Sequence, residues 1–203
     1  MFVRLGLLGL AAVVSFCAAM LHAQPDGICV ITRVEGAAVA SARGAGERPA
    51  ETGLGLGRNA TLVTGSASRV TLACPDGLEV VLGPDSEITV SGVLDGAIRP
   101  FGLRLLDGIA GFLFDRAGGD GVQVRTPSAV AAVRSTEWAM RVEDRASAVF
   151  ARDGTVFVVA DGGTVRLGPG DGVDVTRRGA VGDVVRWGQA RIDLFDELLG
   201  SDW

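Results

Sequence analysis

The stretch DGLEVVLGPDSEITV, residues 76–90, returns in altered form as DGGTVRLGPGDGVDV, residues 161–175. The two copies align without gaps and share Asp-Gly, a valine, Leu-Gly-Pro and apolar residues at matched positions. Proline has no N–H to donate to a β ladder, so each Gly-Pro marks a break between two strands. Each copy is therefore predicted to be one unit of turn, strand, Gly-Pro turn and strand. The pair suggests two similar β layers stacked on each other.

Turn signals of the same kind recur along the chain between short apolar runs. Asp-Gly suits the two central positions of a type I′ hairpin turn, which both need φ > 0. These pairs begin at Asp76, Asp95, Asp107, Asp120, Asp153 and Asp161. Runs rich in Val, Ile, Leu, Thr and Phe predict strands at residues 69–73, 78–82, 87–91, 111–114, 122–125, 147–151, 155–160 and 164–167. The fold class is therefore predicted as all-β, with many short antiparallel strands in a two-layer sandwich or a β-solenoid-like stack.

The pattern changes near the C-terminus and in one earlier segment. Residues 189–199, QARIDLFDELL, place Ile192, Phe195 and Leu198 at helical spacing, and Gly200 follows as a stop signal. One amphipathic helix is predicted here, either docked on the sheet or free to bind a partner. Residues 37–58 are rich in Gly and Ala and are expected to contain an irregular loop.

Several residue types that enzymes depend on are scarce. The chain of 203 residues has no lysine, and its single histidine is His22. If a leader that includes His22 is removed, no histidine is left to serve as a general base or a metal ligand, and no lysine can form a Schiff base or bind phosphate in a P-loop. A non-catalytic protein without cofactor or metal is therefore expected. The formal net charge of −5 also argues against nucleic acid as a partner.

The first residues have the features of a secretory signal peptide. Arg4 precedes an apolar run, and Ala23 provides a small residue at a cleavage position. Cleavage after Ala23 would place the protein in the periplasm, or otherwise outside the cytoplasm, with no integral membrane span left. The alternative is an uncleaved membrane anchor, for which the apolar run is somewhat short.

Two cysteines would remain after cleavage, Cys29 and Cys74. An even number of cysteines in an exported protein favours a disulfide, and two buried free thiols are the alternative. Two thiolates alone cannot complete a zinc site.

Two weaker patterns were weighed as ligand sites. Residues 53–57, GLGLG, resemble part of a nucleotide fingerprint but lack a strand–turn–helix setting. The carboxylates Asp85, Glu87, Asp171 and Asp174 lack the spacing of a calcium loop, so turn and edge-strand positions are expected for them.

Residues 125–142, RTPSAVAAVRSTEWAMRV, resemble the signature of FecR-domain proteins, which has Thr-Pro, small apolar residues and then Val-Arg-Gly-Thr. Further segments at 57–70, 76–86, 105–114, 153–156 and 167–170 resemble the family's other strands in order and spacing. The matching structural positions are Thr126, Pro127, Val133, Arg134, Ser135 and Thr136. Ser135 stands where the family has Gly, and we expect it at a turn or bulge between strands.

The resemblance implies an extracytoplasmic β domain of the kind that relays signals between a receptor and a sigma factor. The anti-sigma segment and the membrane helix of such relays are not expected here, so sigma-factor regulation is not carried over. The domain organisation expected is a signal peptide at 1–23, a lead-in strand at 24–33, a FecR-like β domain at 34–176 and a tail with the helix at 177–203.

The predicted function is that of an exported, non-catalytic domain that binds a protein or an envelope polymer, with envelope signal sensing as one possible use. A sheet face or an edge strand would provide the binding surface. The alternatives are a structural envelope protein and a polysaccharide hydrolase that uses two carboxylates.

Overall fold

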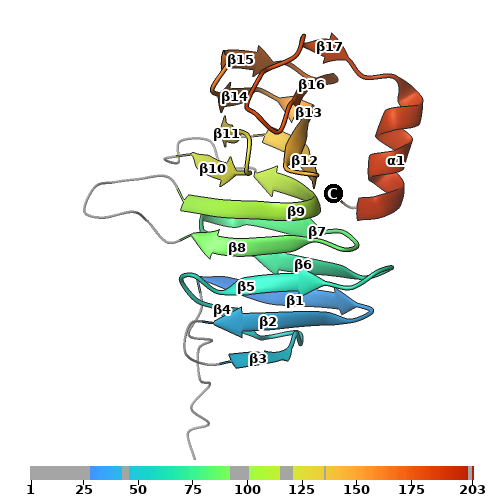
Figure 1. The fold of residues 1–203 in the computed structure, drawn as a ribbon. Coiled ribbons are helices and arrows are strands. Elements are labelled where there is room, and N and C mark those ends of the chain that lie inside the picture. The colour runs from blue at the N-terminus through green and yellow to red at the C-terminus, as the bar shows by residue number, and fades with distance from the viewer. Residues whose placement is uncertain (1–27, 43–45, 92–100, 115–120, 135, 201–202) are drawn as a thin grey trace, which may run out of the picture.

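The computed structural model describes residues 28–42, 46–91, 101–114, 121–134, 136–200 and 203. The predicted signal peptide with its cleavage site at Ala23, the Asp95-Gly96 turn and Ser135 lie outside these residues. In the described part of the chain, the hydrogen-bonded strands form one continuous sheet that folds into two layers and does not close into a barrel (Figure 1). The all-β fold, the two-layer stack and the C-terminal helix are confirmed.

Register pairs give the order of strands in each layer. Layer A runs in the order β4 (Gly55–Leu56), β1 (Cys29–Glu35), β6 (Arg69–Ala73), β7 (Leu78–Leu82), the second half of β9 (Phe101–Phe114), β12 (Thr136–Glu143), β13 (Ala146–Gly154), β16 (Asp171–Val175) and β17 (Val185–Arg186). Layer B runs in the order β3 (Gly46–Pro49), β2 (Ala38–Ala42), β5 (Thr61–Thr64), β8 (Glu87–Ser91), the first half of β9, β10 (Val122–Arg125), β11 (Val130–Val133), β14 (Val156–Ala160) and β15 (Gly163–Leu167). Among the described strands, only the β9–β10 pair is parallel, and the other pairs are antiparallel as predicted.

The main core lies between the layers because each strand alternates its side chains. In β7, Leu78, Val80 and Leu82 are buried, and in β8 Ile88 and Val90 are buried. Side chains from both layers belong to one continuous cluster. Burying an aliphatic side chain of this size contributes roughly 1.5–3 kcal/mol, so this inner face dominates the stability of the stack.

The repeated sequence corresponds to a crossing between the layers. Its first copy contains β7 and β8 and leads from layer A to layer B, whereas its second contains β15 and β16 and leads from B to A. In both copies the Gly-Pro turn lies at the crossing. Each copy of the repeat therefore spans both layers. The prediction that the two copies form two separate, similar layers is wrong.

Two of the Asp-Gly signals are hairpin turns as predicted. Asp76 and Gly77 both have positive φ between β6 and β7, and Asp161-Gly162 joins the paired strands β14 and β15. Asp107-Gly108 is not a hairpin turn: it lies inside β9, where this long strand passes from layer B to layer A. Asp153-Gly154 ends β13 and leads the chain to layer B.

Contacts distant in sequence explain why Gly108 bends a strand instead of ending it. Gly108 has a φ of +80°, and a Cβ there would come within 2.5 Å of Ser86 Cα. The Ser86 hydroxyl, which is buried, accepts a hydrogen bond from the Ile109 N–H at 2.8 Å. Thr64 joins the same corner, since its hydroxyl donates to the Gly83 carbonyl at 2.6 Å. The corner is thus fixed by three segments, which a local turn signal does not reveal.

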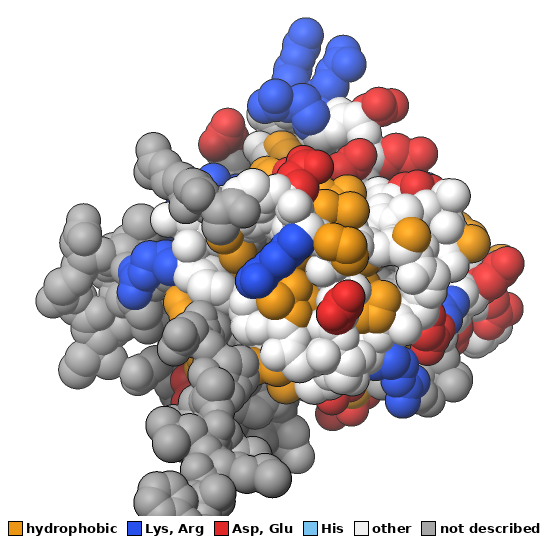
Figure 2. All heavy atoms as spheres, turned by 90° about the horizontal axis from the view of Figure 1, so that it is seen from below, with side chains coloured by type: hydrophobic (Ala, Val, Ile, Leu, Met, Phe, Trp, Pro, Cys, Tyr) orange, Lys and Arg blue, Asp and Glu red, His pale blue; other side chains and the backbone are white. Residues whose placement is uncertain are grey.

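The segment expected to hold an irregular loop contains the strands β2, β3 and β4, with a turn at residues 50–54 between β3 and β4. Strand β3 forms one end of the stack, and its side chains are exposed. Viewed from this end, hydrophobic side chains lie among interspersed basic and acidic ones (Figure 2). Pro49 and the charged Glu47 and Arg48 in β3 are residues that discourage another strand from pairing with a sheet edge.

Candidate binding surface

The C-terminal helix α1 (Gln189–Leu199) covers the part of the outer face of layer A that β7, β9, β12 and β13 form. Phe195 and Leu199 of the helix pack with Val81, Ile109 and other side chains of layer A in a second apolar cluster. The predicted helix is therefore confirmed in its bounds, and it docks on the sheet. Of the two uses considered for it, packing on the sheet is the one the structure shows.

Two tryptophans flank this helix and lie on glycines of layer A. A Cβ on Gly111 would come within 2.9 Å of the Cβ and Cε3 atoms of Trp203, and a Cβ on Gly172 would overlap the indole of Trp187. Trp187 also stacks on Phe150, with ring centroids 4.9 Å apart. Flat contact between a large ring and the sheet therefore depends on glycine at these two positions.

Arginines hold the same segment from both sides. Arg69 donates to the carbonyl oxygens of Leu198 at 3.0 Å and Glu197 at 3.2 Å, which are among the free carbonyls at the helix C-terminus. Arg191 forms a two-pronged ion pair with Asp174 at 2.9 and 2.5 Å. These contacts hold the C-terminal segment over the middle of layer A.

The outer face of layer B has no such cover from the described residues. Strand β14 places Val156 and Val158 in the core and turns Phe157 and Val159 outward, where they are 47% and 43% exposed. Register pairs set Ala132 beside Phe157 and Val130 beside Val159. We call Val130, Ala132, Phe157 and Val159 the β11–β14 patch.

A hollow lies at each end of this patch. The first has a volume of about 790 Å³ and is lined by Gly121, Val122, Gln123, Ala132, Val133, Arg134, Thr136, Gly154, Thr155, Phe157 and Arg166. The second has a volume of about 510 Å³ and is lined by Thr126, Pro127, Ser128, Ala129, Val130, Arg145, Val159, Ala160, Asp161, Arg177, Arg178 and Gly179. The larger hollow has no carboxylate among its lining residues.

Arginines surround the patch. Arg134 and Arg166 line the first hollow, and Arg145, Arg177 and Arg178 line the second. Arg104 and Arg125 are register partners on the neighbouring strands β9 and β10, and both are exposed. None of the seven forms an ion pair with any residue that the structure describes. Arg166 donates to the Thr155 hydroxyl at 3.2 Å, but its charge, like that of the other six, has no described carboxylate beside it. An apolar strip bordered by such guanidinium groups can bind a segment that is both apolar and anionic.

Some residues of the Arg125–Val142 motif lie in the turn between β10 and β11, and others are buried beside it. Thr126 closes the turn between β10 and β11, because its hydroxyl accepts from the Ala129 N–H at 2.9 Å and shares a hydrogen bond of 2.7 Å with the Ser147 hydroxyl. Pro127 lies within this turn. Val133 and Thr136 are buried, and the Thr136 hydroxyl donates to the Thr155 carbonyl at 3.2 Å.

Arg134 is exposed, as Pro127 is, and it borders the larger hollow. Most of the motif therefore supports the hairpin, and Arg134 is its accessible charged member. Ser135 lies outside the described residues.

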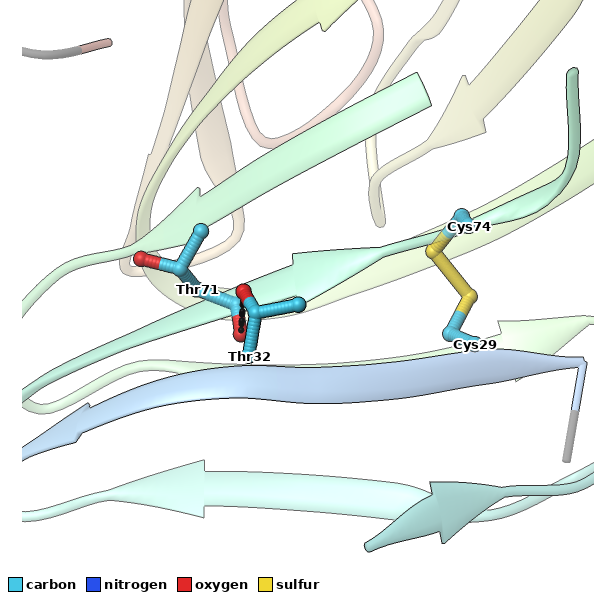
Figure 3. Close-up of a disulfide and its surroundings, with 4 residues drawn as sticks. All are labelled: Cys29, Thr32, Thr71 and Cys74. Carbon is cyan, nitrogen blue, oxygen red and sulfur yellow. Dashed lines mark hydrogen bonds between the residues drawn. A yellow bond between two sulfur atoms is a disulfide. The ribbon is translucent and has the colours of Figure 1, made fainter. Parts of the chain in front are cut away.

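The cysteine prediction is supported, because Cys29 and Cys74 form a disulfide (Figure 3). The bond links β1 to the end of β6, two strands already paired through Val30 and Ala73. On the same pair of strands, the Thr32 hydroxyl donates to the Thr71 carbonyl at 3.2 Å. The disulfide thus fastens the N-terminal strand to the stack.

Two of the four carboxylates compared with a calcium site have partners in the protein. Asp171 accepts from the Gly168 N–H at 3.0 Å, and Asp174 pairs with Arg191. Within the described ranges, no three His, Cys, Asp or Glu side chains gather where a metal ion could be held. None of the described helices is long and apolar enough to span a bilayer.

Sequence reasoning missed Phe157, Val159 and Arg166 as surface residues. A signal was present in β14, whose sequence VFVVA is apolar on both faces. Strands that are apolar throughout are typical of sheets covered on both sides, so an uncovered one points to a contact surface.

Comparison with known proteins identifies the domain. Residues 60–157 match the family model described as FecR protein. Two crystal structures of a "putative anti-sigma factor" from Parabacteroides distasonis ATCC 8503, at 2.50 and 1.65 Å resolution, resemble the chain. Each has a TM-score of 0.53 and 22% identity, covering 63% of this chain and 59% of the other. The likeness shows a shared fold over about three fifths of that protein. Among curated proteins, none matches the chain significantly.

Proposed function

We propose that this chain, whose residues 60–157 are a FecR domain, is an exported, non-catalytic module that recognises a protein partner through the outer face of layer B. The observation that carries the proposal is the contrast between the two layers. In layer A, α1 and its flanking tryptophans bury the outer side chains of Val81, Ile109 and Phe150, whereas Phe157 of layer B remains 47% exposed. Exposed apolar surface rimmed by polar residues is typical of a protein contact site.

Export is supported by the signal-like residues 1–23 and by the disulfide. Disulfides persist in oxidising compartments such as the periplasm and are rare in the cytosol. Edman degradation or mass analysis of the protein from the cell envelope tests this part, since we expect an N-terminus at Gln24. A chain that begins at Met1 and stays in the cytoplasm would contradict export.

The protein is proposed to sense its partner by reversible occupancy of this face, and the family supports such a regulatory use. The anti-sigma description of the structural neighbour suggests a protein as the bound molecule rather than a small substrate. An envelope polymer is the other ligand class that the sequence left open, and it is the alternative outcome of the binding experiment below.

Photo-crosslinking in intact cells tests the site. A benzoylphenylalanine at position 157 is compared with one at position 63, because Val63 is also exposed on layer B, at 43%, but lies in the other half of the stack. We expect a discrete protein adduct from position 157 and none from position 63. Equal adducts from both positions, or none from position 157, would contradict the proposed site.

A further inference from the structure

The two hollows beside the β11–β14 patch lie along one line. Ala132 and Phe157 border the first hollow, and Val130 and Val159 border the second. Each strand of the pair therefore contributes one apolar side chain to each end. The hollows and the patch form a single strip that runs parallel to β11 and β14.

The strip has the length of a short extended peptide. The extended residues of β11, Val130 to Val133, cover about 10 Å at about 3.3 Å per residue, and a hollow continues the strip beyond each end. A partner segment would need about four extended residues to follow β11 and further residues to enter the two hollows. Its central side chains would meet Phe157 and Val159, and its ends would lie among arginines.

The positive charge at both ends of the strip indicates that the bound segment is anionic there. Arg134 and Arg166 lie at one end, and Arg145, Arg177 and Arg178 lie at the other. Asp161 is the one carboxylate among the residues lining the two hollows. The whole chain carries a formal net charge of −5, so this gathering of basic groups runs against its overall charge.

Guanidinium groups recognise carboxylates by paired, charge-assisted hydrogen bonds, and arginines with aromatic side chains are enriched among the residues that dominate binding. We propose that the β11–β14 patch binds an extended, acidic segment of a partner protein, apolar in its middle and rich in Asp or Glu at both ends. This inference rests on the proposed function, because it names the chemistry of the partner at the same face.

Synthetic peptides test the proposal with the full mature chain. The probe is a fluorescent nine-residue peptide with two glutamates at each end and five apolar or small residues between them. The matched peptide has lysine in place of each glutamate. We expect saturable binding of the glutamate peptide that weakens as salt is raised, and none of the lysine peptide.

Charge reversal locates the site. The double variant Arg166→Glu, Arg178→Glu changes one arginine at each end of the strip, and the control Arg48→Glu changes an exposed arginine at the β3 end. We expect the double variant to raise the Kd for the glutamate peptide by about tenfold or more, and the control to leave it within about twofold. Circular dichroism and thermal melts establish that all variants are folded.

Several results would overturn the inference. They are no binding of the glutamate peptide at millimolar concentration, equal binding of the lysine peptide, or an equal effect of Arg48→Glu. If a polyuronate added as a competitor binds more tightly than the glutamate peptide, the ligand is an acidic envelope polymer and the inferred protein segment is wrong.

If the crosslinked adduct from position 157 survives in the double variant, the proposed function stands and the acidic partner is wrong. If position 157 gives no adduct in the unaltered protein, the binding face itself is wrong.

Discussion

Trp203 lies directly on Gly111, so close that a Cβ on this glycine would come within 2.9 Å of the tryptophan's Cβ and Cε3. Arg152 lies over the Trp203 ring, 3.8 Å from its centroid. The ring thus contacts both strand β9 and an arginine of β13. These contacts hold the C-terminal residue on layer A.

Gly111→Ala is expected to destabilise the protein and loosen the C-terminal segment. The added methyl group must displace Trp203 or the strand, and overpacking of this kind costs about 1–3 kcal/mol. Urea denaturation measures the loss in the free energy of unfolding, and tryptophan fluorescence reports a change in the surroundings of the Trp203 ring. The matched control is Gly102→Ala in the same strand, where the nearest atom to a new Cβ is 3.7 Å away. An equal cost for the two variants would show that Trp203 does not pack as described.

Reduction of the Cys29–Cys74 disulfide is expected to lower the free energy of unfolding by about 2–4 kcal/mol, because the bond closes a loop between residues 45 apart in sequence. Urea denaturation with and without dithiothreitol measures the change. The Cys29→Ser, Cys74→Ser variant is the control and should have the lower stability in both conditions. A reductant effect of the same size in this variant would mean that the disulfide is not the cause.

Thr126→Val is expected to cost about 1–2 kcal/mol, because it removes the hydroxyl that accepts from the Ala129 N–H and contacts Ser147. Thr126→Ser keeps the hydroxyl and should retain most of the stability. Thermal melts compare the two variants. If serine is as damaging as valine, the hydroxyl is not what the motif threonine provides.

Phe157→Ser is expected to leave the free energy of unfolding within about 0.5 kcal/mol, because the side chain lies on the surface, outside both apolar clusters, and is 47% exposed. Val158→Ser changes the next residue, which is fully buried, and should cost about 2 kcal/mol or more. Chemical denaturation measures both. A large loss from the first variant would indicate that Phe157 serves the fold rather than binding.

Local patterns in the sequence predicted much of the fold. The bounds of β6, β7, β8 and the C-terminal helix agree with the alternation or the helical spacing of apolar residues. These elements are short and each has one clear apolar face, so the periodicity alone locates them.

The long strand β9 could not be predicted in the same way. Asp107-Gly108 has the composition of a hairpin turn, yet the corner is set by Ser86 and Thr64 from distant parts of the chain. Turn chemistry indicates that φ is positive at Gly108 but does not say whether the chain reverses or crosses between layers. That choice depends on tertiary contacts.

The binding face was likewise hidden from sequence reasoning. Arg134 was identified as a motif residue, but the patch beside it depends on the register of β11 against β14. It also depends on which layer α1 covers, and the helical spacing predicts that the helix is amphipathic without saying which layer it meets.

Photo-crosslinking from position 157 in intact cells, quantified against positions 63 and 194, tests the central claim most directly. All three side chains are at least 40% exposed, but Val63 is in the other half of layer B and Leu194 lies on α1. The account predicts a discrete protein adduct from position 157 alone. Adducts from position 63 or 194 with none from position 157 would contradict the claim that the β11–β14 patch of layer B recognises the partner.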